Sequence, residues 1–293
     1  METTKNQTQH ITESRLTNAW AELQNHAGSG NALTADAYRL AFADPEFLLR
    51  RETRGIRFQL EMLKPDLAQQ ERGIDNTVVV FGSARVRDPS VAKELLAVAE
   101  ASGDSQTIER AHALLRNSAY YEHARQFGRA VARHSARCAP QDQLYICTGG
   151  GPGIMEAANR GAHDEGALNV GLNIALPHEQ SANPYVTPEL SFKFHYFALR
   201  KMHFMMRAKA LVVFPGGFGT LDELFEVITL VQCRKAKPLP VVLFGSEYWK
   251  RLLNLDVLVE EGMIAPEDLN LFSFADGPEP AWAIIQRVYN LPG

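Results

Sequence analysis

The sequence predicts an α/β fold, in which a doubly wound, mostly parallel sheet carries helices on both faces and follows a helical N-terminal arm. Two observations predict this fold. Short apolar runs alternate with helical patterns from residue 77 onward, and such alternation indicates βαβ units. Glycine-rich turns directly follow three of the apolar runs, as expected where buried strands end.

The arm is expected to span residues 1–75, and the main domain residues 76–293. Up to about residue 35 the arm is polar and low in aliphatic side chains, which is typical of a flexible segment, with one helix around residues 15–24. From Thr34 to Leu67 apolar residues recur at helical spacing, and Pro65 should end the helix. We expect this helical part to pack on the main domain or on a partner subunit.

In the main domain, short apolar runs predict the strands and longer periodic patterns predict the helices. Strands are expected at residues 77–81, 144–148, 169–174, 210–214 and 239–244, with a short one at 192–196. Helices are expected at residues 91–101, 118–136, 154–161, 197–208, 221–230, 248–259 and 280–289. Residues 103–107 are expected to form a loop, which makes the first crossover longer than a minimal one.

The composition is that of a globular protein, with 45% hydrophobic and 22% charged residues. A net charge of −4 gives no basic surface for nucleic acid. The cysteines Cys138, Cys147 and Cys233 lack metal-ligand spacing, and unpaired thiols fit a reducing cytoplasm. The polar first residues show no signal peptide and no apolar run reaches the ~20 residues of a membrane span. We therefore expect a cytoplasmic protein that contacts neither membrane nor nucleic acid and holds no metal.

Three glycine turns are expected on one rim of the sheet, because each follows a strand: Gly82-Ser83, Gly149–Gly153 and Gly216–Gly219. Such turns point backbone N–H groups at a ligand and bind phosphate, although a single one can serve only to reverse the chain. The second turn reads GGGPG rather than GxGxxG, Asn173 stands where a ribose-binding acid is expected, and no Gly-Lys-Ser/Thr occurs. The rim thus predicts a phosphate site that serves neither NAD nor ATP hydrolysis.

A basic pair and a carboxylate should meet at this rim. Arg200 and Lys201 fall in the first turn of the helix expected at 197–208, where a cation opposes the helix dipole at a cost of roughly a few tenths of a kcal/mol. Either solvent screens these cations or an anion holds them. Glu223 follows the strand after that helix, so Arg200 and Glu223 are expected to be neighbours. The alternative is a surface arginine beside a helix-capping glutamate, since Thr220 and Glu223 match the Thr-x-x-Glu capping box.

Other chemistry-bearing residues give weaker signals. The methionines Met202, Met205 and Met206 with Phe204 favour core packing over the lining of a site for a flat base. Lys201 as a Schiff-base lysine for pyridoxal phosphate lacks a supporting aspartate pattern. The histidines have no metal spacing and are expected to be structural or at the surface: His178, His195 and His203.

The segment 215–223, PGGFGTLDE, resembles the PGGxGTxxE motif of the Lonely Guy (LOG) family. Characterised LOG members are cytokinin riboside 5′-monophosphate phosphoribohydrolases, and many bacterial members carry the older label of lysine decarboxylase. Arg200-Lys201 looks like the family's Arg-Lys element, and the first two glycine turns, the first together with Arg85, look like the family's turns. The resemblance covers about residues 77–289.

The resemblance implies a Rossmann-like nucleotide-binding catalytic domain, a homodimer or higher homo-oligomer, and no cofactor. The implied reaction is hydrolysis of the N-glycosidic bond of a nucleoside 5′-monophosphate, with AMP or an N6-substituted AMP as the favoured substrate. Arg200 and Glu223 match the family's catalytic residues. The residues expected to bind phosphate or nucleotide are Gly82, Ser83, Arg85, Gly149, Gly150, Gly151, Lys201, Pro215, Gly216, Gly217, Gly219 and Thr220.

Two departures bear on the base that is recognised. Short LOG members often have a glycine soon after the triple-glycine turn, where this chain has Met155-Glu156-Ala157. The arm and the long first crossover are absent from the shortest members, so the chain looks closer to the longer bacterial branch. An alternative function is a non-catalytic binding protein for a nucleotide or pterin phosphate, similar to molybdenum-cofactor carriers.

Overall fold

The computed structural model describes residues 40–176 and 181–291. The chain divides into two compact units, which part between Arg57 and Phe58. The described part of the first unit holds the single turn η2 (Ala41–Ala43), the short helix α2 (Pro45–Leu49) and the start of α3 (Arg54–Glu71). Asp44 caps α2 by accepting the Phe47 N–H at 3.1 Å. The helix expected around residues 15–24 lies outside the described residues, and the 75/76 domain boundary stays a prediction.

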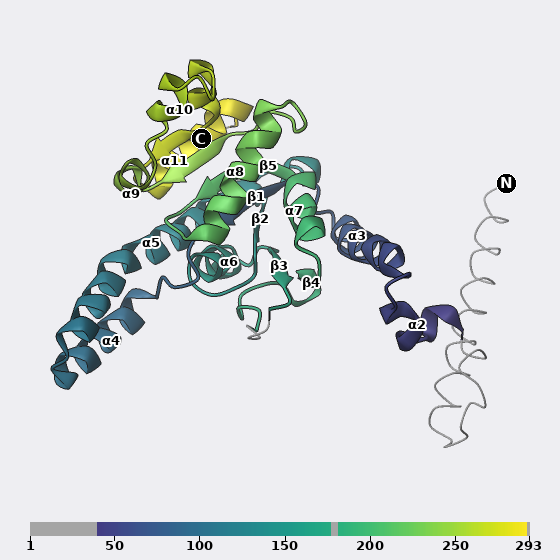
Figure 1. Ribbon diagram of the computed structural model, residues 1–293, viewed down its shortest axis with the longest axis horizontal. Helices are drawn as coiled ribbons and strands as arrows, with labels where there is room; N and C mark the ends of the chain where they lie inside the picture. Colours follow the sequence, from purple (N-terminus) through teal and green to yellow (C-terminus); the bar gives the residue numbers. More distant parts are fainter. Residues whose placement is uncertain (1–39, 177–180, 292–293) are drawn as a thin grey trace. The chain divides into compact units, whose positions relative to one another are not determined.

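The second unit is built on one parallel sheet of seven strands in the order β4-β3-β2-β1-β5-β6-β7 (Figure 1). The strands are β1 (Thr77–Phe81), β2 (Tyr145–Thr148), β3 (Val170–Ile174), β4 (Ser191–Phe194), β5 (Ala208–Val213), β6 (Val241–Phe244) and β7 (Ser273–Ala275). β1 pairs with both β2 and β5. The chain changes direction across the sheet at β1 and β5, so the fold is Rossmann-like and doubly wound, with its switch point between these two strands.

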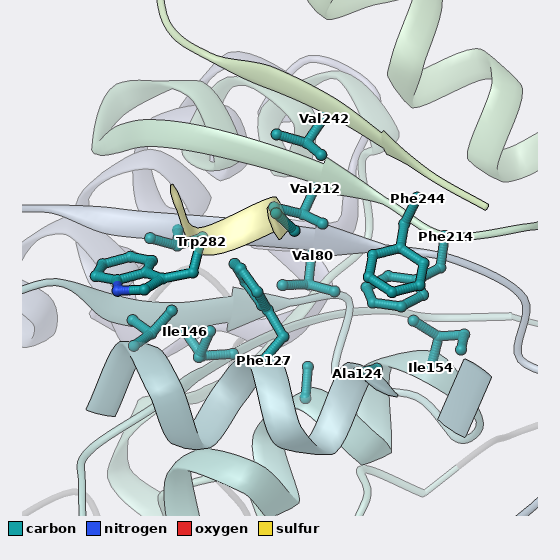
Figure 2. Packing of buried hydrophobic residues seen from close by; sticks show 14 of the residues in the cluster. Val80, Ala124, Phe127, Ile146, Ile154, Val212, Phe214, Val242, Phe244 and Trp282 are labelled. Atoms are coloured by element: carbon teal, nitrogen blue, oxygen red, sulfur yellow. The ribbon is translucent and has the colours of Figure 1, made fainter. Parts of the chain in front are cut away.

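Two hydrophobic clusters form because successive side chains of a strand point to opposite faces. Val80 and Val212 point into one cluster, where they pack over Phe127 of α5 (Ser105–Ser135). Figure 2 shows this face, with Phe214 stacked on Phe244 at 4.3 Å between ring centroids. Their neighbours in the strands, such as Val79 and Leu211, point into the second cluster together with side chains of α7 (Phe197–Met206) and α8 (Phe218–Gln232).

The helices of this unit follow the strands in the expected alternation. They are α4 (Pro89–Ser102), α5, α6 (Ile154–Asp164), α7 (Phe197–Met206), α8 (Phe218–Gln232), α9 (Ser246–Leu252), α10 (Asp256–Glu260) and α11 (Pro278–Tyr289), with the short 3-10 turns η3 (Pro140–Asp142), η4 (Pro188–Leu190) and η5 (Pro266–Leu271). No helix in the described part of the chain is long and apolar enough to cross a membrane.

Pro65 does not end α3, contrary to expectation, because the helix continues to Glu71. Proline has no N–H, so the carbonyl four residues earlier loses its helical donor. That carbonyl belongs to Glu61, and it is paired with His203 Nε2 at 3.2 Å. A side chain from another helix thus replaces the missing backbone hydrogen bond.

Three further differences concern short stretches. The loop expected at 103–107 is only the link Gly103-Asp104: Gly103 ends α4 in the left-handed region at φ 68°, and Asp104 caps α5 by accepting the Thr107 N–H at 2.9 Å. α5 therefore begins at Ser105 rather than at Ser118. The helix expected at 248–259 is two helices, α9 and α10, and the three-residue strand β7 was not expected.

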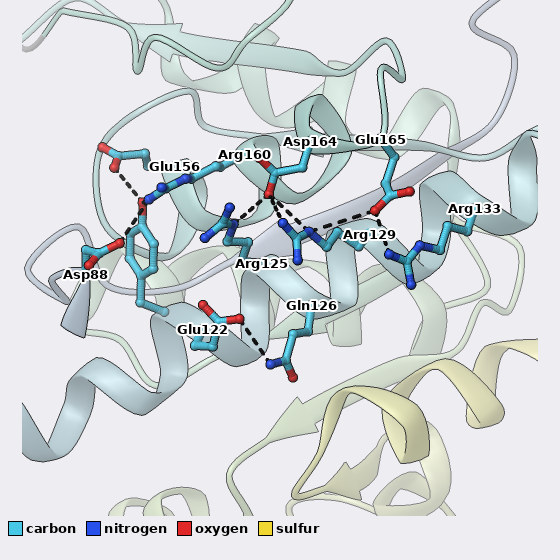
Figure 3. Close-up of polar contacts among 11 residues, drawn as sticks. Asp88, Glu122, Arg125, Gln126, Arg129, Arg133, Glu156, Arg160, Asp164 and Glu165 are labelled. Atoms are coloured by element: carbon cyan, nitrogen blue, oxygen red, sulfur yellow. Dashed lines mark hydrogen bonds and ion pairs between the residues drawn. The ribbon is translucent and has the colours of Figure 1, made fainter. Parts of the chain in front are cut away.

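α5 and α6 cross closely and are joined by a row of ion pairs (Figure 3). Asp164, at the end of α6, accepts from Arg125 Nε at 2.6 Å and from Arg129 Nη2 at 2.8 Å. Burial tends to raise the pKa of Asp164, but the arginine hydrogen bonds outweigh it and the pKa is lowered. These arginines offset the unfavourable position of a carboxylate at a helix C-terminus.

Candidate active site

A pocket of about 630 Å³ opens at the carboxyl ends of the central strands. The loop after β1, the glycine after β2, the middle of α7 and the start of α8 line it. This is the switch point of the sheet, where doubly wound proteins hold their ligands. The volume lies in the range of small-molecule sites.

Arg200 and Glu223 are neighbours in this pocket, as expected from their places at the carboxyl ends of the strands. Arg200 Nη2 donates to Glu223 Oε1 at 2.5 Å, and the side chains are 11% and 8% exposed. Arg200 Nε and Glu223 Oε2 are buried without a hydrogen-bond partner among the described residues. Buried polar atoms are normally paired, so this ion pair keeps one donor and one acceptor whose hydrogen bonds are not made within the protein.

The protonation of Glu223 is set mainly by burial, which raises its pKa to about 7. The charges of Arg200 and Lys201 act in the opposite direction and favour the carboxylate. The ion pair therefore does not hold Glu223 fully ionised at neutral pH. A carboxyl group that titrates near pH 7 inside a pocket is typical of a residue that exchanges protons or stabilises a transient cation.

Aromatic rings fix the guanidinium of Arg200. Its Cζ lies 5.3 Å from the ring centroid of Phe197 and 5.4 Å from that of Phe204. Phe204 in turn packs edge-on against Phe81 of β1, with 4.8 Å between centroids. Cation–π contacts of this kind hold a planar guanidinium while leaving its N–H groups free to bind.

The capping-box alternative for Thr220 and Glu223 is wrong. α8 begins at Phe218, its N-cap is Gly217, and no side chain caps it. Glu223 is therefore in the second turn of the helix, where its carboxylate pairs with Arg200. The Gly216 backbone lies close against Thr220, because a Cβ on Gly216 would lie 2.1 Å from Thr220 Oγ1.

Lys201 lies beside the pocket rather than in its lining. Its Nζ pairs with Asp222 Oδ2 and Glu226 Oε2 of α8, each at 2.8 Å. The anions that hold the two cations of α7 are thus the protein's own carboxylates. A bound phosphate is not needed to explain them, although Lys201 still adds positive charge near Glu223.

Most of the expected ligand-binding residues come together in the pocket lining. These are Arg200, Glu223, Gly82, Ser83, Arg85, Gly149, Gly217, Gly219 and Thr220. The lining does not include Gly150, Gly151, Lys201, Pro215 or Gly216. Pro215 and Gly216 instead line a smaller neighbouring pocket of about 180 Å³, which shares Ser83 and Arg85 with the first.

The carbonyl groups of Gly150 and Gly151 form hydrogen bonds with a loop that packs over them. The Gly150 carbonyl accepts the Asn183 N–H at 2.8 Å, and the Gly151 carbonyl accepts Asn183 Nδ2 at 3.0 Å. Asn183 also bonds to the buried Asn159 at 3.0 Å. This buried polar network shapes the turn after β2, and ligand binding by Gly150 and Gly151 stays a prediction.

Met155 and Phe218 line the pocket although the sequence did not single them out for this role. Met155 lies two residues after the end of the second glycine turn, and Phe218 occupies the variable position of the PGGxGTxxE motif. Their place beside glycine turns was the available signal. Both add apolar surface to the lining, the kind of surface that contacts a flat base.

Of the histidines singled out in the sequence, His203 takes a structural position and His195 is exposed. His203 is buried between α7 and α3, His195 precedes α7, and His178 lies outside the described residues. No cluster of three or more histidine, cysteine or acidic side chains that could hold a metal occurs within 40–176 and 181–291.

Comparisons with known proteins agree with the motif. The family described as possible lysine decarboxylase matches residues 155–285. Two rice (Oryza sativa subsp. japonica) proteins named probable cytokinin riboside 5′-monophosphate phosphoribohydrolase are each 33% identical, over 121 and 139 residues. These alignments cover 40% and 46% of this chain, and 48% and 59% of the relatives.

The resemblance to the LOG family is confirmed. An Arabidopsis thaliana protein named cytokinin riboside 5′-monophosphate phosphoribohydrolase is 31% identical over 121 residues, which is 40% of this chain and 55% of that relative. The chain thus spans about half the length of the curated LOG relatives it matches. The region that the family model matches, residues 155–285, includes α7 and α8, which carry Arg200 and Glu223.

Two solved structures show a looser likeness. A molybdenum cofactor binding protein of Rippkaea orientalis has 21% identity and a TM-score of 0.40, covering 58% of this chain and 88% of that one. The Moco carrier protein of Chlamydomonas reinhardtii has 19% identity and a TM-score of 0.43, covering 74% and 98%. At these values the likenesses carry no argument about what this chain binds.

Proposed function

We propose that this protein is a nucleoside 5′-monophosphate phosphoribohydrolase. It cleaves the N-glycosidic bond of AMP or of an N6-substituted AMP, and releases the free base and ribose 5-phosphate. The observation that carries the proposal is the buried Arg200–Glu223 pair in the switch-point pocket, with Glu223 Oε2 unpaired. The names of the LOG relatives support the reaction class.

The reaction needs a negative group beside the ribose. When the bond between C1′ and the base nitrogen breaks, its electron pair leaves with the base and C1′ becomes positive, as in glycoside hydrolysis. The Glu223 carboxylate stabilises this cation and orients the water whose oxygen bonds to C1′. The departing base takes up a proton from solvent water, and the proton released by the attacking water passes to Glu223 and from there back to solvent.

The other parts of the pocket orient the nucleotide. The start of α8 with Gly217 and Gly219 offers backbone N–H groups and the positive end of the helix dipole for the 5′-phosphate. Arg200 holds phosphate or ribose oxygens through N–H groups that its pairing with Glu223 leaves available. Phosphate binding away from C1′ contributes orientation without taking part in bond cleavage.

The test is chromatographic detection of free base and ribose 5-phosphate from AMP, GMP, CMP, UMP and N6-isopentenyl-AMP. Wild-type protein is expected to release base fastest from an adenine nucleotide. Glu223→Gln should lower the rate by at least about 100-fold, since acid–base and charge stabilisation are lost together. Glu226→Gln is the matched control, because it removes a carboxylate of the same helix that pairs with Lys201 instead.

The outcomes separate the two candidate functions. Base release that survives in Glu226→Gln and disappears in Glu223→Gln supports the hydrolase. Nucleotide or pterin phosphate that binds and is recovered intact would overturn the proposal and favour a carrier. The cytoplasmic location and the homodimer or higher assembly that accompany the hydrolase reading remain predictions.

A further inference from the structure

A side chain of α3 forms hydrogen bonds with the beginning of α7, the helix that carries Arg200. Glu61 of α3 accepts the His195 N–H on Oε1 at 2.9 Å and the Tyr196 N–H on Oε2 at 3.1 Å. Tyr196 is the N-cap of α7 and its own side chain makes no capping bond. A carboxylate in this position pairs free N–H groups and is attracted by the positive end of the helix dipole.

Further contacts hold the same helix at both ends. The Phe58 ring packs edge-on against Tyr196, with 4.4 Å between centroids. At the C-cap of α7, Arg207 Nη2 pairs with Asp66 Oδ1 at 2.7 Å. Since the Glu61 carbonyl is also paired with His203 in the last turn of α7, α3 contacts α7 along its length.

The contact between Glu61 and Tyr196 is linked to Arg200 by one backbone hydrogen bond. The Arg200 N–H donates to the Tyr196 carbonyl at 3.2 Å, so the residue that Glu61 holds is also the first-turn partner of Arg200. A shift of Tyr196 would carry Arg200 with it. The short bond from Arg200 Nη2 to Glu223, at 2.5 Å, depends on that placement.

We propose that Glu61 is a positioning residue, which sets the register of α7 so that Arg200 reaches Glu223 in the pocket. The catalytic part of this proposal rests on the proposed hydrolase function. The structural part does not, because it concerns only the Arg200–Glu223 pair. α3 is then part of the active-site framework as well as a cover for the second hydrophobic cluster.

The consequence is electrostatic. Burial raises the pKa of Glu223, whereas Arg200 and Lys201 lower it and the acids Asp222 and Glu226 of its own helix raise it. The charge of Glu223 also raises the pKa of the Cys147 thiol in β2. The cationic Arg85 lines the same pocket as Glu223. If Arg200 withdraws, the largest lowering influence weakens and the pKa of Glu223 rises further.

The first measurement is carbon-13 NMR titration of the glutamate carboxyl groups in the full chain, with Glu223→Gln used to assign the Glu223 signal. Glu61→Gln keeps the size of the side chain but removes its charge, and is expected to raise the pKa of Glu223 by about half a unit to one unit. Glu71→Gln, an exposed glutamate at the end of the same helix, is the matched control and should leave the Glu223 titration unchanged.

A double variant shows whether the effect passes through Arg200. In an Arg200→Ala background, adding Glu61→Gln should not move the Glu223 titration any further. Glu61→Asp keeps the charge but draws the carboxylate back, so it should shift the Glu223 titration less than Glu61→Gln. It also provides a folded alternative if the glutamine variant is unstable.

Activity gives a second readout if wild-type protein hydrolyses a nucleotide. Glu61→Gln should then lower kcat by about tenfold, with the rise of activity on the acidic side moved to higher pH. An unchanged Glu223 titration in a folded Glu61→Gln protein overturns the positioning role. Absence of hydrolysis by wild-type protein, with the NMR shift present, overturns the hydrolase proposal alone.

Discussion

At the scale of single residues, Glu223 is in an environment that opposes its charge. Its side chain is 8% exposed and one carboxylate oxygen is unpaired. In the folded protein the pKa of Glu223 is therefore raised to about 7, whereas in the unfolded chain its pKa is near 4.5. Between these pH values the folded state binds a proton that the unfolded state has lost, so stability falls as pH rises.

Replacing Glu223 by glutamine removes this pH-dependent cost. The free energy of unfolding of Glu223→Gln, relative to wild type, should improve by up to roughly 3 kcal/mol between pH 4.5 and 8. Urea unfolding of both proteins at several pH values measures it, and other titrating groups cancel in the difference. A difference that does not change with pH would contradict the raised pKa.

The sequence predicted Arg200 and Glu223 because their places depend only on strand and helix order. Both follow from the rule that helix starts and strand ends share one rim of a parallel sheet. It did not predict the loss of Gly150 and Gly151 from the pocket, since their partner Asn183 is distant in the chain. Nor did it predict Glu61, whose role depends on how α3 packs against α7.

At the scale of elements, close contact between α5 and α6 depends on glycines. A Cβ on Gly161 would lie 2.0 Å from the Arg125 carbonyl oxygen, and one on Gly128 would lie 2.4 Å from the Ala158 carbonyl oxygen. Neither obstacle is a flexible side chain, so the helices themselves must separate to accept a methyl group. The ion pairs of Arg125 and Arg129 with Asp164 span the same crossing.

Gly161→Ala should consequently lower the free energy of unfolding by about 3 kcal/mol, as overpacking does. Gly55→Ala is the matched control, because this glycine is also helical and a Cβ there meets nothing within 4 Å. It should be neutral or stabilising by up to about 1 kcal/mol. Thermal unfolding of the two variants and of wild type measures these changes in stability. Equal changes in the two variants would contradict the prediction and show that α5 and α6 have room to adjust.

Helix and strand types were largely predictable, but their ends were not. α3 passes through Pro65 because His203 supplies the donor that proline lacks, which no local pattern reveals. β7 was missed because three residues are too few to show a period. α5 begins early because Gly103 and Asp104 form a two-residue link, a compact solution where a longer loop was expected.

At the scale of the whole molecule, Cys147 is a natural reporter of the central sheet. It lies in β2, it is 2% exposed, and burial raises the pKa of its thiol. Cys233 is exposed and Cys138 is half-buried. Thiols react as thiolates and only when a reagent can reach them, so the three cysteines should differ widely in reactivity.

A chromogenic disulfide reagent should label Cys233 at once and Cys147 only when the sheet unfolds. In increasing urea, the labelling of Cys147 is expected to follow loss of circular dichroism, because opening β2 means separating it from β1. Cys233→Ser should remove the fast phase and leave the Cys147 phase intact. Rapid labelling of Cys147 in the absence of denaturant would show that the centre of the sheet opens locally.

The pocket draws its lining from segments far apart in the chain, from Phe81 at the end of β1 to Glu223 in α8. This arrangement has a consequence for protein synthesis. When β1 and β2 have emerged from the ribosome, α7 and α8 have not yet been made, so a nascent chain offers a nucleotide only part of its site. Ligand present in the cell therefore cannot help the first strands to fold, and they depend on contacts within the growing chain until Glu223 has joined them.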